Sequence, residues 1–467
     1  MEGRPESRYK NRVFPDGRYF HRRLDCGLLL AVEVLPARKS VSLEMRFLSG
    51  MAAEPADRLG LAFLTEQTIS KGTERRSGQG LSDAFDALGA LHGSWVGRES
   101  IGFRCTCLPE YVDGVLDLFQ EMLRTPTFPE ESCRIAVELA NQELTALEDD
   151  PGELARKYSA RHAYGPLLGR HPYGERDTLA RIGRNDIISY WQQNICAGRL
   201  LVAAAGPVDP PRLVERLEAA FAGFGMTGTP GWTSAEGAAE AESAFTPGRW
   251  HYEKELEQQQ IVICWPGVPM THADHPVERV LLSLLGEGMS SRLFTEVREK
   301  LGLVYWVGAW HEHPRRAGMI HLGASSTPGQ CARTHATLLR EVDRLADDLT
   351  AGELARAQTL LIARSDTHGD ITRARTSELA ADLFYYERPV SIEEKNAAVA
   401  SVTIEDIRRY LHEHPRDGLC VVTLGPTALA DSATDAASSQ AEAVSAVGAG
   451  VPPPNAVAAR PASETCA

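Results

Sequence analysis

Apolar residues recur along the chain with two spacings, and each spacing predicts a kind of element. In the segment 110–123 (EYVDGVLDLFQEML), four apolar residues share one helical face: Val112, Val115, Leu116 and Phe119. The runs LLVAAAG (200–206) and LCVVTLG (419–425) are short, apolar and followed by proline, as is typical of buried strands. Strands and helices occur together without a strict strand–helix–strand alternation. The pattern therefore predicts an α+β fold with mainly antiparallel sheets.

Two segments that start about 220 residues apart resemble each other. Residues 179–209 and 399–427 each contain an Asp-Ile-x-x-Tyr helix, ending at Tyr190 and Tyr410, before the apolar run and Gly-Pro. The stretches SLEMRFLSGM (42–51) and QQIVICWPGV (259–268) also correspond, because each predicts a strand, a loop and then a helix. The chain is therefore predicted to be a duplication of two homologous lobes, each an α/β sandwich.

The composition between these segments predicts the domain limits. Residues 227–249 are rich in Gly, Ala, Ser, Thr and Pro without hydrophobic periodicity, which predicts a linker between a first lobe (10–226) and a second lobe (250–427). The tail 428–467 has few large apolar residues and is predicted to be disordered. Two joined lobes create a cleft, which is a usual place for a ligand.

Charge and composition exclude some classes of partner. The 467 residues carry a net charge of -14 and contain no long block of Lys or Arg, which argues against nucleic acid. The polar first residues argue against a signal peptide, and no run approaches the roughly 20 apolar residues of a membrane helix. The expectation is a cytoplasmic protein without a membrane partner.

Cysteine and histidine give only weak signals on their own. The nine cysteines are scattered and odd in number, which argues against a disulfide framework. Cys105 and Cys107 alternate onto one face of a predicted strand, where buried thiols are a better interpretation than a metal pair. The pairs His311/His313 and His412/His414 would each share a face in an extended chain, but both precede proline and are interpreted as solvated ends of elements.

The stretch GLAFLTEQTISKGT (60–73) has the position of a metal motif without its histidines. Residues four apart stack on one helical face, so histidines at 63 and 67 beside Glu66 would provide two zinc ligands and a base. Phe63 and Gln67 occupy these positions. Taken alone, the stretch predicts an amphipathic helix with these residues inward: Leu61, Leu64 and Ile69.

The residues around this stretch resemble the M16 (pitrilysin or insulinase) metallopeptidases, whose inverted zinc motif HxxEH falls at this place. The flanking Gly-Leu-Ala and Lys-Gly-Thr match, and VELANQELTALEDDP (137–151) resembles the segment that carries the third ligand, at Glu143. Ala136 replaces a supporting acid of the family. The resemblance therefore implies that Phe63, Glu66, Gln67 and Glu143 form a degenerate site, and that this chain binds no metal and no cofactor.

The second lobe contains GMSSRLFTEVREKLGLVYWVGAW (288–310), which closely resembles the M16 second-lobe motif. The resemblance implies that Arg298 and Tyr305 are catalytic residues that hold the substrate backbone and the developing oxyanion. Guanidinium and phenol groups are donors suited to charge that appears on a carbonyl oxygen. The structural alternatives are an Arg298 that only pairs with Glu296, Glu299 or a helix end, and a Tyr305 in the strand core.

The family's substrate-binding edge strand is less clear in this chain. The corresponding segment reads ALGALHGSWVGRES (87–100), with Gly93 and Ser94 near the family's Asn-Ala positions. A sheet edge can still bind an extended peptide through its backbone. Trp95 is expected either to block this edge or to stack on a side chain.

The resemblance spans about residues 10–427 and implies a division of labour between two chains. The expected function is the non-zinc-binding subunit of a heterodimeric M16-type peptidase, inactive alone. A homologous zinc-bearing subunit would hold Zn²⁺, and a peptide would be the substrate. The alternative is a catalytically inactive M16-like assembly or peptide-binding protein. An independent peptidase with another metal geometry is a third, weaker possibility.

Overall fold

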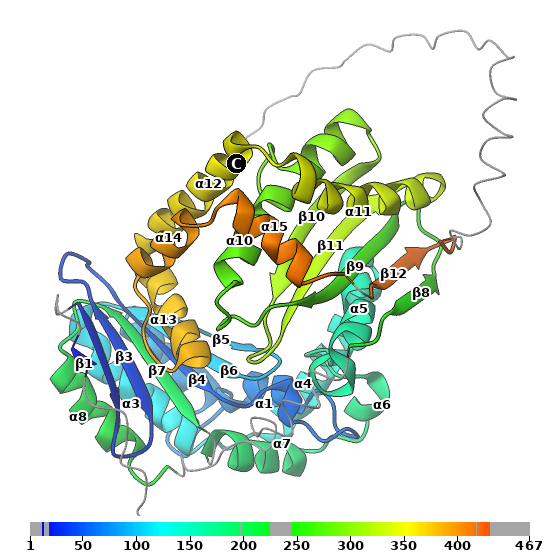
Figure 1. The fold of residues 1–467 in the computed structure, drawn as a ribbon. Coiled ribbons are helices and arrows are strands. Elements are labelled where there is room, and N and C mark those ends of the chain that lie inside the picture. Colours follow the sequence, from blue (N-terminus) through cyan, green and yellow to red (C-terminus); the bar gives the residue numbers. More distant parts are fainter. Residues whose placement is uncertain (1–11, 14–17, 197–198, 225–244, 417, 430–467) are drawn as a thin grey trace, which may run out of the picture.

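The structure, a computed structural model, describes residues 12–13, 18–196, 199–224, 245–416 and 418–429 (Figure 1). It contains two β-sheets. The first sheet has the strand order β1 (Arg12–Val13), β2 (Tyr19–Arg23), β3 (Leu29–Val34), β7 (Leu200–Gly206), β4 (Val41–Phe47), β6 (Ile101–Cys107) and β5 (Leu91–Val96). The second has the order β10 (Val304–Glu312), β11 (Gly318–Ser326), β9 (Gln259–Gly267), β12 (Cys420–Gly425) and β8 (Gly248–Glu253).

The order β3-β7-β4-β6-β5 in the first sheet is repeated as β8-β12-β9-β11-β10 in the second. The pairs β3/β7 and β8/β12 are parallel, and the other neighbours within both sheets are antiparallel. The two runs that end at Gly-Pro form β7 and β12, and every residue of both strands is buried. The predicted α+β fold with two homologous, mainly antiparallel lobes is confirmed.

The two tyrosines of the repeated helix have the same kind of structural role. Tyr190 is buried and bonds to the backbone of Gly50: its hydroxyl donates to the carbonyl at 2.8 Å and accepts from the N–H at 3.0 Å. Tyr410 is also buried, but its hydroxyl donates to the Glu278 carboxylate. The repeat therefore keeps a buried tyrosine in each lobe while its partner changes from a loop backbone to an acid.

Helices pack on both sheets. The helices of the first half are α1 (Leu61–Ile69), α2 (Gly78–Ala87), α3 (Val112–Arg124), α4 (Glu130–Glu148), α5 (Pro151–Leu168), α6 (Arg176–Leu179), α7 (Arg184–Trp191) and α8 (Pro210–Phe221), with the 3-10 helices η1 (Met51–Ala53) and η2 (Pro109–Tyr111) and the π-helix η3 (Gln192–Cys196). Those of the second half are α10 (His275–Gly286), the π-helix η5 (Leu293–Lys300), η6 (Pro328–Gln330), α11 (Cys331–Asp348), α12 (Ala351–Gly369), α13 (Thr372–Tyr386), α14 (Ile392–Ala400) and α15 (Ile404–Glu413). The helix predicted from Glu110 begins at Val112, because residues 109–111 form η2.

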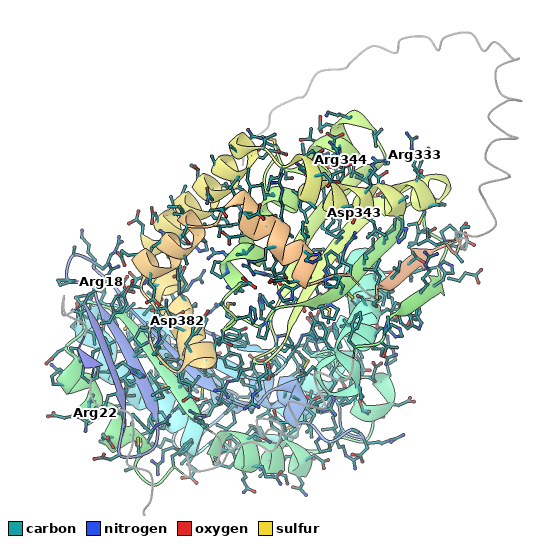
Figure 2. All side chains as sticks on the ribbon, viewed as in Figure 1. Arg18, Arg22, Arg333, Asp343, Arg344 and Asp382 are labelled. Carbon is teal, nitrogen blue, oxygen red and sulfur yellow. The ribbon has the colours of Figure 1, made fainter. Side chains whose placement is uncertain are left out.

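Each half of the chain donates one helix to the other half's sheet (Figure 1). Helix α13, from the second half, packs on β3, β7 and β4, where Leu379 and Leu383 join an apolar cluster with Leu29 and Leu201. Asp382, labelled in Figure 2, forms an ion pair with Lys395 of α14 at 2.7 Å. The first sheet is therefore covered on both faces, by helices from both halves.

Helix α5 makes the reciprocal contact from the first half. It packs on β9 and β12, and its Ala163 and Leu168 join a cluster with Cys264 and Val422. Gly165, at φ +66°, breaks the helix within this contact and precedes a proline. The limits of the lobes along the sequence therefore differ from their limits in space.

Parts of the predicted organisation lie outside the described residues. The predicted linker 227–249 is described only from residue 245, and its last two positions, Gly248 and Arg249, belong to strand β8. The predicted tail is described only at residues 428–429. Within the described part of the chain, every helix is too short or too polar to cross a bilayer. Eight cysteines are described, all are free thiols, and Cys105 and Cys107 are buried as expected.

Candidate functional site

Phe63 fills the place expected for a first zinc ligand with a packed ring. Helix α1 begins after Gly60, whose φ of +105° favours glycine, and the Ala62 N–H donates to Glu54 Oε1 at 2.8 Å. The Phe63 side chain is buried and meets the ring of Tyr173 edge-on, with 5.1 Å between ring centroids. This aromatic contact occupies the space beside the helix where a ligand would project.

Glu66 and Gln67 hydrogen-bond to each other. The Gln67 amide donates from Nε2 to Glu66 Oε2 at 2.8 Å, and the Ser94 hydroxyl of β5 donates to Glu66 Oε1. Burial raises the pKa of Glu66, although these two hydrogen bonds oppose the shift. The acid that serves as a base in the family motif is therefore held by neutral donors.

Glu143 lies on α4, which packs against α1, and it interacts with Tyr173. Burial and then the Glu143 carboxylate raise the pKa of the Tyr173 phenol. Ala136, at the position of the family's supporting acid, is a buried core residue of α4. Tyr173 thus connects Phe63 to Glu143, a link that the sequence interpretation did not identify.

These residues do not fit a zinc ion. Zinc sites in proteins use imidazole, thiolate and carboxylate ligands, whereas Phe63 has no donor atom and Gln67 points its amide at Glu66. Tyr173 further engages Glu143, the one carboxylate left at a ligand position. No catalytic step is therefore assigned to a metal in this first-lobe site.

Strand β5 forms an edge of the first sheet and contacts α1. Trp95 on this strand packs inward over β6, where its indole fills the place that a side chain at Gly102 would take, 2.3 Å from an added Cβ. The Arg46 guanidinium also lies 4.9 Å from the centre of the Trp95 ring. Of the two roles expected for Trp95, the structure shows stacking on a side chain.

Arg298 and Tyr305 lie together in the second lobe. The Arg298 guanidinium carbon is 5.3 Å from the centre of the Tyr305 ring and 4.8 Å from that of Phe294. Tyr305 is 74% exposed and sits in a β-bulge at the start of edge strand β10. Bulges re-aim side chains and occur often beside active sites. Tyr305 is therefore not a core strand residue.

The ion pairs near Arg298 leave its guanidinium partly exposed. Its nearest described acid is Glu299, at 3.7 Å, whereas Glu296 pairs with Lys300 at 2.7 Å. The Arg298 side chain is 37% exposed. An exposed ion pair with 3.7 Å between its atoms contributes little free energy, so the Arg298 guanidinium stays available to another acceptor.

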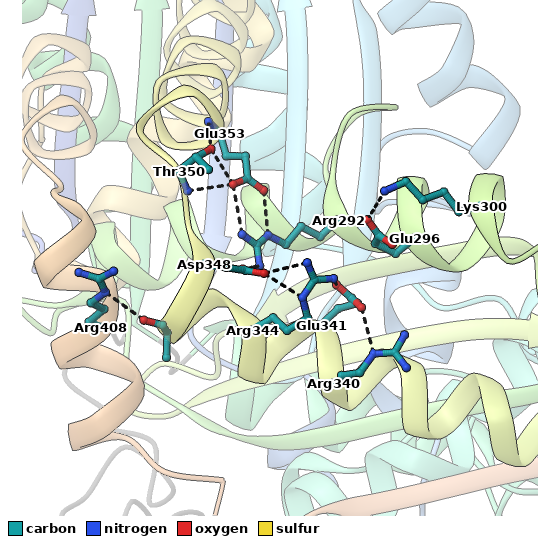
Figure 3. A network of polar contacts seen from close by, with 11 residues as sticks. Arg292, Glu296, Lys300, Arg340, Glu341, Arg344, Asp348, Thr350, Glu353 and Arg408 are labelled. Carbon is teal, nitrogen blue, oxygen red and sulfur yellow. Dashed lines mark hydrogen bonds and ion pairs between the residues drawn. The ribbon is translucent and has the colours of Figure 1, made fainter.

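Arg292, the arginine of the SSRLF segment, anchors the start of η5. It is 8% exposed and donates to Glu353 Oε1 at 2.9 Å and to Asp348 at 2.6 Å (Figure 3). Thr350 and Glu353 also form the capping box of α12, so the same carboxylate fixes a helix start and η5. Arg292 is a positioning residue for η5, and the sequence interpretation did not single it out.

A cavity of about 650 Å³ lies between α5 of the first half and the sheet of the second. Its main lining residues are Arg98, Arg156, Tyr164, His171, Trp306, Trp310, Glu312 and His321. None of the six predicted site residues lines it. Trp306 follows Tyr305, and His171 packs on Tyr173 with 5.0 Å between ring centroids. The cavity is therefore related to the predicted half-sites only through Trp306 and His171.

A polar network crosses the cavity between the lobes. Arg98 donates to Glu312 Oε2 at 2.7 Å, and the Tyr164 hydroxyl lies 3.0 Å from the same oxygen and 2.9 Å from His321 Nε2. Burial alone would raise the pKa of Glu312, but Arg98 and the other partners lower it to about 2. One feature of the sequence indicates this surface. Residues two apart on a strand share a face, so β10 places these residues on one side of the sheet: Trp306, Gly308, Trp310 and Glu312.

The interpretation of His311 and His313 as solvated residues is wrong. The His313 side chain is 3% exposed and that of His311 is 25% exposed. Both rings pack against His275 at the start of α10. The interpretation failed because the local sequence does not show that α10 covers this end of β10. His412, by contrast, is exposed on α15, as expected, whereas His414 is 29% exposed and its Nε2 lies 3.5 Å from Asp274 Oδ2.

Family comparisons agree with the duplicated fold. The chain matches the family "Insulinase (Peptidase family M16)" over residues 29–171 and the "Peptidase M16 inactive domain" over residues 181–361. An uncharacterized zinc protease of Streptomyces coelicolor is 28% identical over 390 residues, covering 82% of this chain and 84% of the relative. A probable mitochondrial-processing peptidase subunit beta of Arabidopsis thaliana is 21% identical, covering 86% of this chain and 77% of the relative.

Solved structures share the fold. A peptidase M16 inactive domain from Pseudomonas fluorescens superposes with a TM-score of 0.78 at 19% identity, covering 88% of this chain and 99% of that one. A protease from Helicobacter pylori gives 0.76 at 15% identity, covering 87% and 99%. With the two family matches on successive halves and the repeated sheet order, the chain belongs to the peptidase M16 family.

Proposed function

We propose that this chain is the non-zinc-binding subunit of a heterodimeric M16-type peptidase and is inactive alone. A homologous subunit with an intact HxxEH motif is the partner, it holds the Zn²⁺, and a peptide is the substrate. This chain contributes Arg298 and Tyr305 to the shared site. We place the protein in the cytoplasm, because the eight cysteines in the described residues are free thiols, which suits a reducing compartment.

The observation that carries this proposal is the exposed Arg298–Tyr305 pair. A phenol that is 74% exposed at a bulge, with a guanidinium carbon 5.3 Å from its ring, is not explained by packing. Both groups can donate hydrogen bonds, so they suit a carbonyl oxygen that gains negative charge. The buried Arg292 supports this arrangement by fixing the start of η5.

The first-lobe residues support the need for a partner. Phe63 and Gln67 do not provide zinc ligands beside Glu143, whereas several relatives are named zinc proteases. One similar protein is named as a subunit of a peptidase. A chain that retains only the Arg/Tyr half requires the zinc half from elsewhere, and a homologous chain has the matching architecture.

The experiment mixes this protein with a zinc-bearing M16 homologue from the same genome and measures cleavage of a short fluorogenic peptide. The mixture is expected to cleave far faster than either protein alone. Tyr305→Phe removes only the hydroxyl, and Arg298→Ala removes the guanidinium. Each variant should lower kcat of the mixture by about 10²–10³ if it donates to the oxyanion. Tyr111→Phe and Arg340→Ala, at exposed positions, are the matched controls.

Complex formation is measured separately by analytical ultracentrifugation. A complex that forms without any gain in cleavage supports the alternative, an inactive assembly or peptide-binding protein. Unchanged kcat in both Arg298→Ala and Tyr305→Phe contradicts the proposed roles. Stoichiometric zinc bound through Glu66 and Glu143 in the isolated chain, lost in Glu143→Gln, would contradict the division of labour.

A further inference from the structure

Three histidines and a glutamate with buried, unsatisfied side-chain atoms lie where α10 meets the end of β10. The Nε2 atoms of His275 and His313, Nδ1 of His311 and Oε1 of Glu278 are all buried and lack a hydrogen-bond partner in the structure. The ligand atoms of the three histidines lie within 4.8 Å of one another. Buried polar atoms are nearly always satisfied in folded proteins, so this group of unsatisfied atoms calls for a common partner.

The distances favour a shared ion over hydrogen bonds. Glu278 Oε1 is 3.5 Å from His313 Nε2 and 3.6 Å from His311 Nδ1. Both separations exceed the 2.7–3.2 Å range of N–H···O hydrogen bonds. Two ligands of a tetrahedral zinc ion, each about 2.0–2.1 Å from the metal, stand about 3.3 Å apart. The observed separations are close to that value.

The backbone explains why these side chains meet. His311 and His313 are two residues apart at the end of β10, so they point to the same side of the sheet, and the intervening Glu312 points into the inter-lobe cavity. His275 and Glu278 are three apart at the start of α10, so they share a helical face. Packing of α10 on β10 brings the two pairs together.

A second layer of contacts orients the carboxylate. Glu278 is fully buried, and its other oxygen, Oε2, accepts from the Val268 N–H at 2.8 Å and from the Tyr410 hydroxyl. Oε1 is thereby directed at the imidazoles. Metal-ligating carboxylates are commonly held in this way by outer hydrogen bonds. Tyr410 is the buried tyrosine of the second-lobe repeat, so a residue of the duplicated motif supports the cluster.

The chemistry of these side chains also suits a cation, because imidazole binds a metal in its neutral form and a carboxylate binds it when ionised. The quarter-exposed side of His311 provides an entry path.

We infer that His275, His311 and His313 form a site for a zinc ion in the second lobe, with the Glu278 carboxylate beside His311 and His313. Imidazole nitrogens suit Zn²⁺. The ion joins α10 to the end of β10. This site is separate from the degenerate first-lobe residues, and it departs from the expectation that the chain binds no metal. It does not depend on the proposed peptidase role.

The test uses the full chain, purified without a histidine tag. Metal analysis should find about one zinc per chain. After chelation, the wild-type protein should lose thermal stability and regain it with added ZnCl₂. Loading with Co²⁺ should give the visible absorption of tetrahedral cobalt. His313→Ala should lose the cobalt spectrum and bind zinc at least 10-fold more weakly. Loss of even an outer hydrogen-bond partner of a ligand lowers metal affinity by about 10–100-fold, so loss of a ligand should cost at least as much.

Controls separate the site from folding and from the first lobe. His311→Asn, at a partly exposed position, is expected to fold while losing the zinc-dependent rise in Tm. His412→Ala, an exposed histidine, and Glu143→Gln should both keep the cobalt spectrum. Absence of zinc uptake and of a cobalt spectrum in the wild-type chain overturns the inference. So does undiminished zinc binding by both His313→Ala and His311→Asn.

Discussion

The ring of Phe63 packs edge-on against the ring of Tyr173, with 5.1 Å between their centroids. Tyr173 in turn interacts with Glu143, so one aromatic residue covers both the missing and the surviving ligand positions. The first-lobe site therefore differs from a zinc site not only at the two positions where histidines are missing. The residues around them are also packed together.

This packing leads to a prediction about restoring the site. Phe63→His/Gln67→His is expected to take up one zinc equivalent more than the wild-type chain. Adding Tyr173→Phe should weaken that binding about 10-fold or more, because it removes an outer partner of the Glu143 carboxylate. Zinc titration with a competing chelator measures both steps. If the double variant takes up no additional zinc, the helix α1 backbone no longer has the geometry of a metal site.

The buried ion pair of Glu33 and Arg375 is expected to stabilise the packing of α13 on the first sheet. Their side chains are 0% and 2% exposed and lie 2.8 Å apart, although the residues are far apart in sequence. Arg375→Met leaves a buried carboxylate with Arg18 as its remaining ion-pair partner at 2.7 Å, so the free energy of unfolding should fall by about 3–5 kcal/mol. Urea unfolding measures the change.

The matched control is Arg134→Met, since Arg134 is 57% exposed and pairs with exposed acids on α4. That change should cost less than about 1 kcal/mol. Replacing both partners, as Glu33→Leu/Arg375→Met, should recover much of the loss, because no buried charge is left alone. Equal effects of Arg375→Met and Arg134→Met would contradict the structural role of the buried pair.

Because of Glu54, the free energy of unfolding is expected to depend on pH. It is 4% exposed, its Oε1 accepts from the Ala62 N–H, and its Oε2 is buried without a partner. Burial raises its pKa to about 8 from 4.5. The folded protein thus keeps a proton that the unfolded chain releases above about pH 4.5. The contribution to stability is fully present below that pH and is lost as pH rises through about 8.

Glu54→Gln should remove this dependence. Relative to the variant, the wild-type free energy of unfolding should fall by up to about 1.4 kcal/mol for each pH unit within the window. Urea unfolding of both proteins at several pH values between about 5 and 8 tests the prediction. Glu405→Gln, at a side chain that is 82% exposed, should run parallel to the wild type. A constant difference between wild type and Glu54→Gln would show that Glu54 titrates normally.

Gly323 leaves room for the two indole rings of the cavity wall. A Cβ at this position of β11 would lie 2.8 Å from Trp306 and 2.9 Å from Trp310. Gly323→Ala should therefore displace both indoles, change the near-UV circular dichroism and cost about 1–3 kcal/mol of stability. Gly329→Ala, where an added Cβ meets nothing within 4 Å, should change neither. A double-mutant cycle of Gly323→Ala and Trp306→Ala should give a non-zero coupling energy in the free energy of unfolding. If the two effects on stability simply add, the contact is refuted.

Several features of this protein could be predicted from the sequence because they depend on local backbone geometry. Period-two and helical spacing of apolar residues predicted buried strands such as β7 and β12 and the helix α3. The repeated Asp-Ile-x-x-Tyr segment predicted two lobes of one fold. The motif around Arg298 and Tyr305 could be identified because the two residues lie seven apart across one helix end and one strand.

Other features were decided only by the tertiary structure. The exchange of α5 and α13 between sheets, the Tyr173 link between Phe63 and Glu143, and the cross-lobe contact of Arg98 with Glu312 join residues distant in sequence. His311 and His313 carry no sign in their own segment that α10 will bury them. The physical reason is that spacing along the chain determines which face a residue occupies, whereas the packing of helices on sheets determines what that face meets.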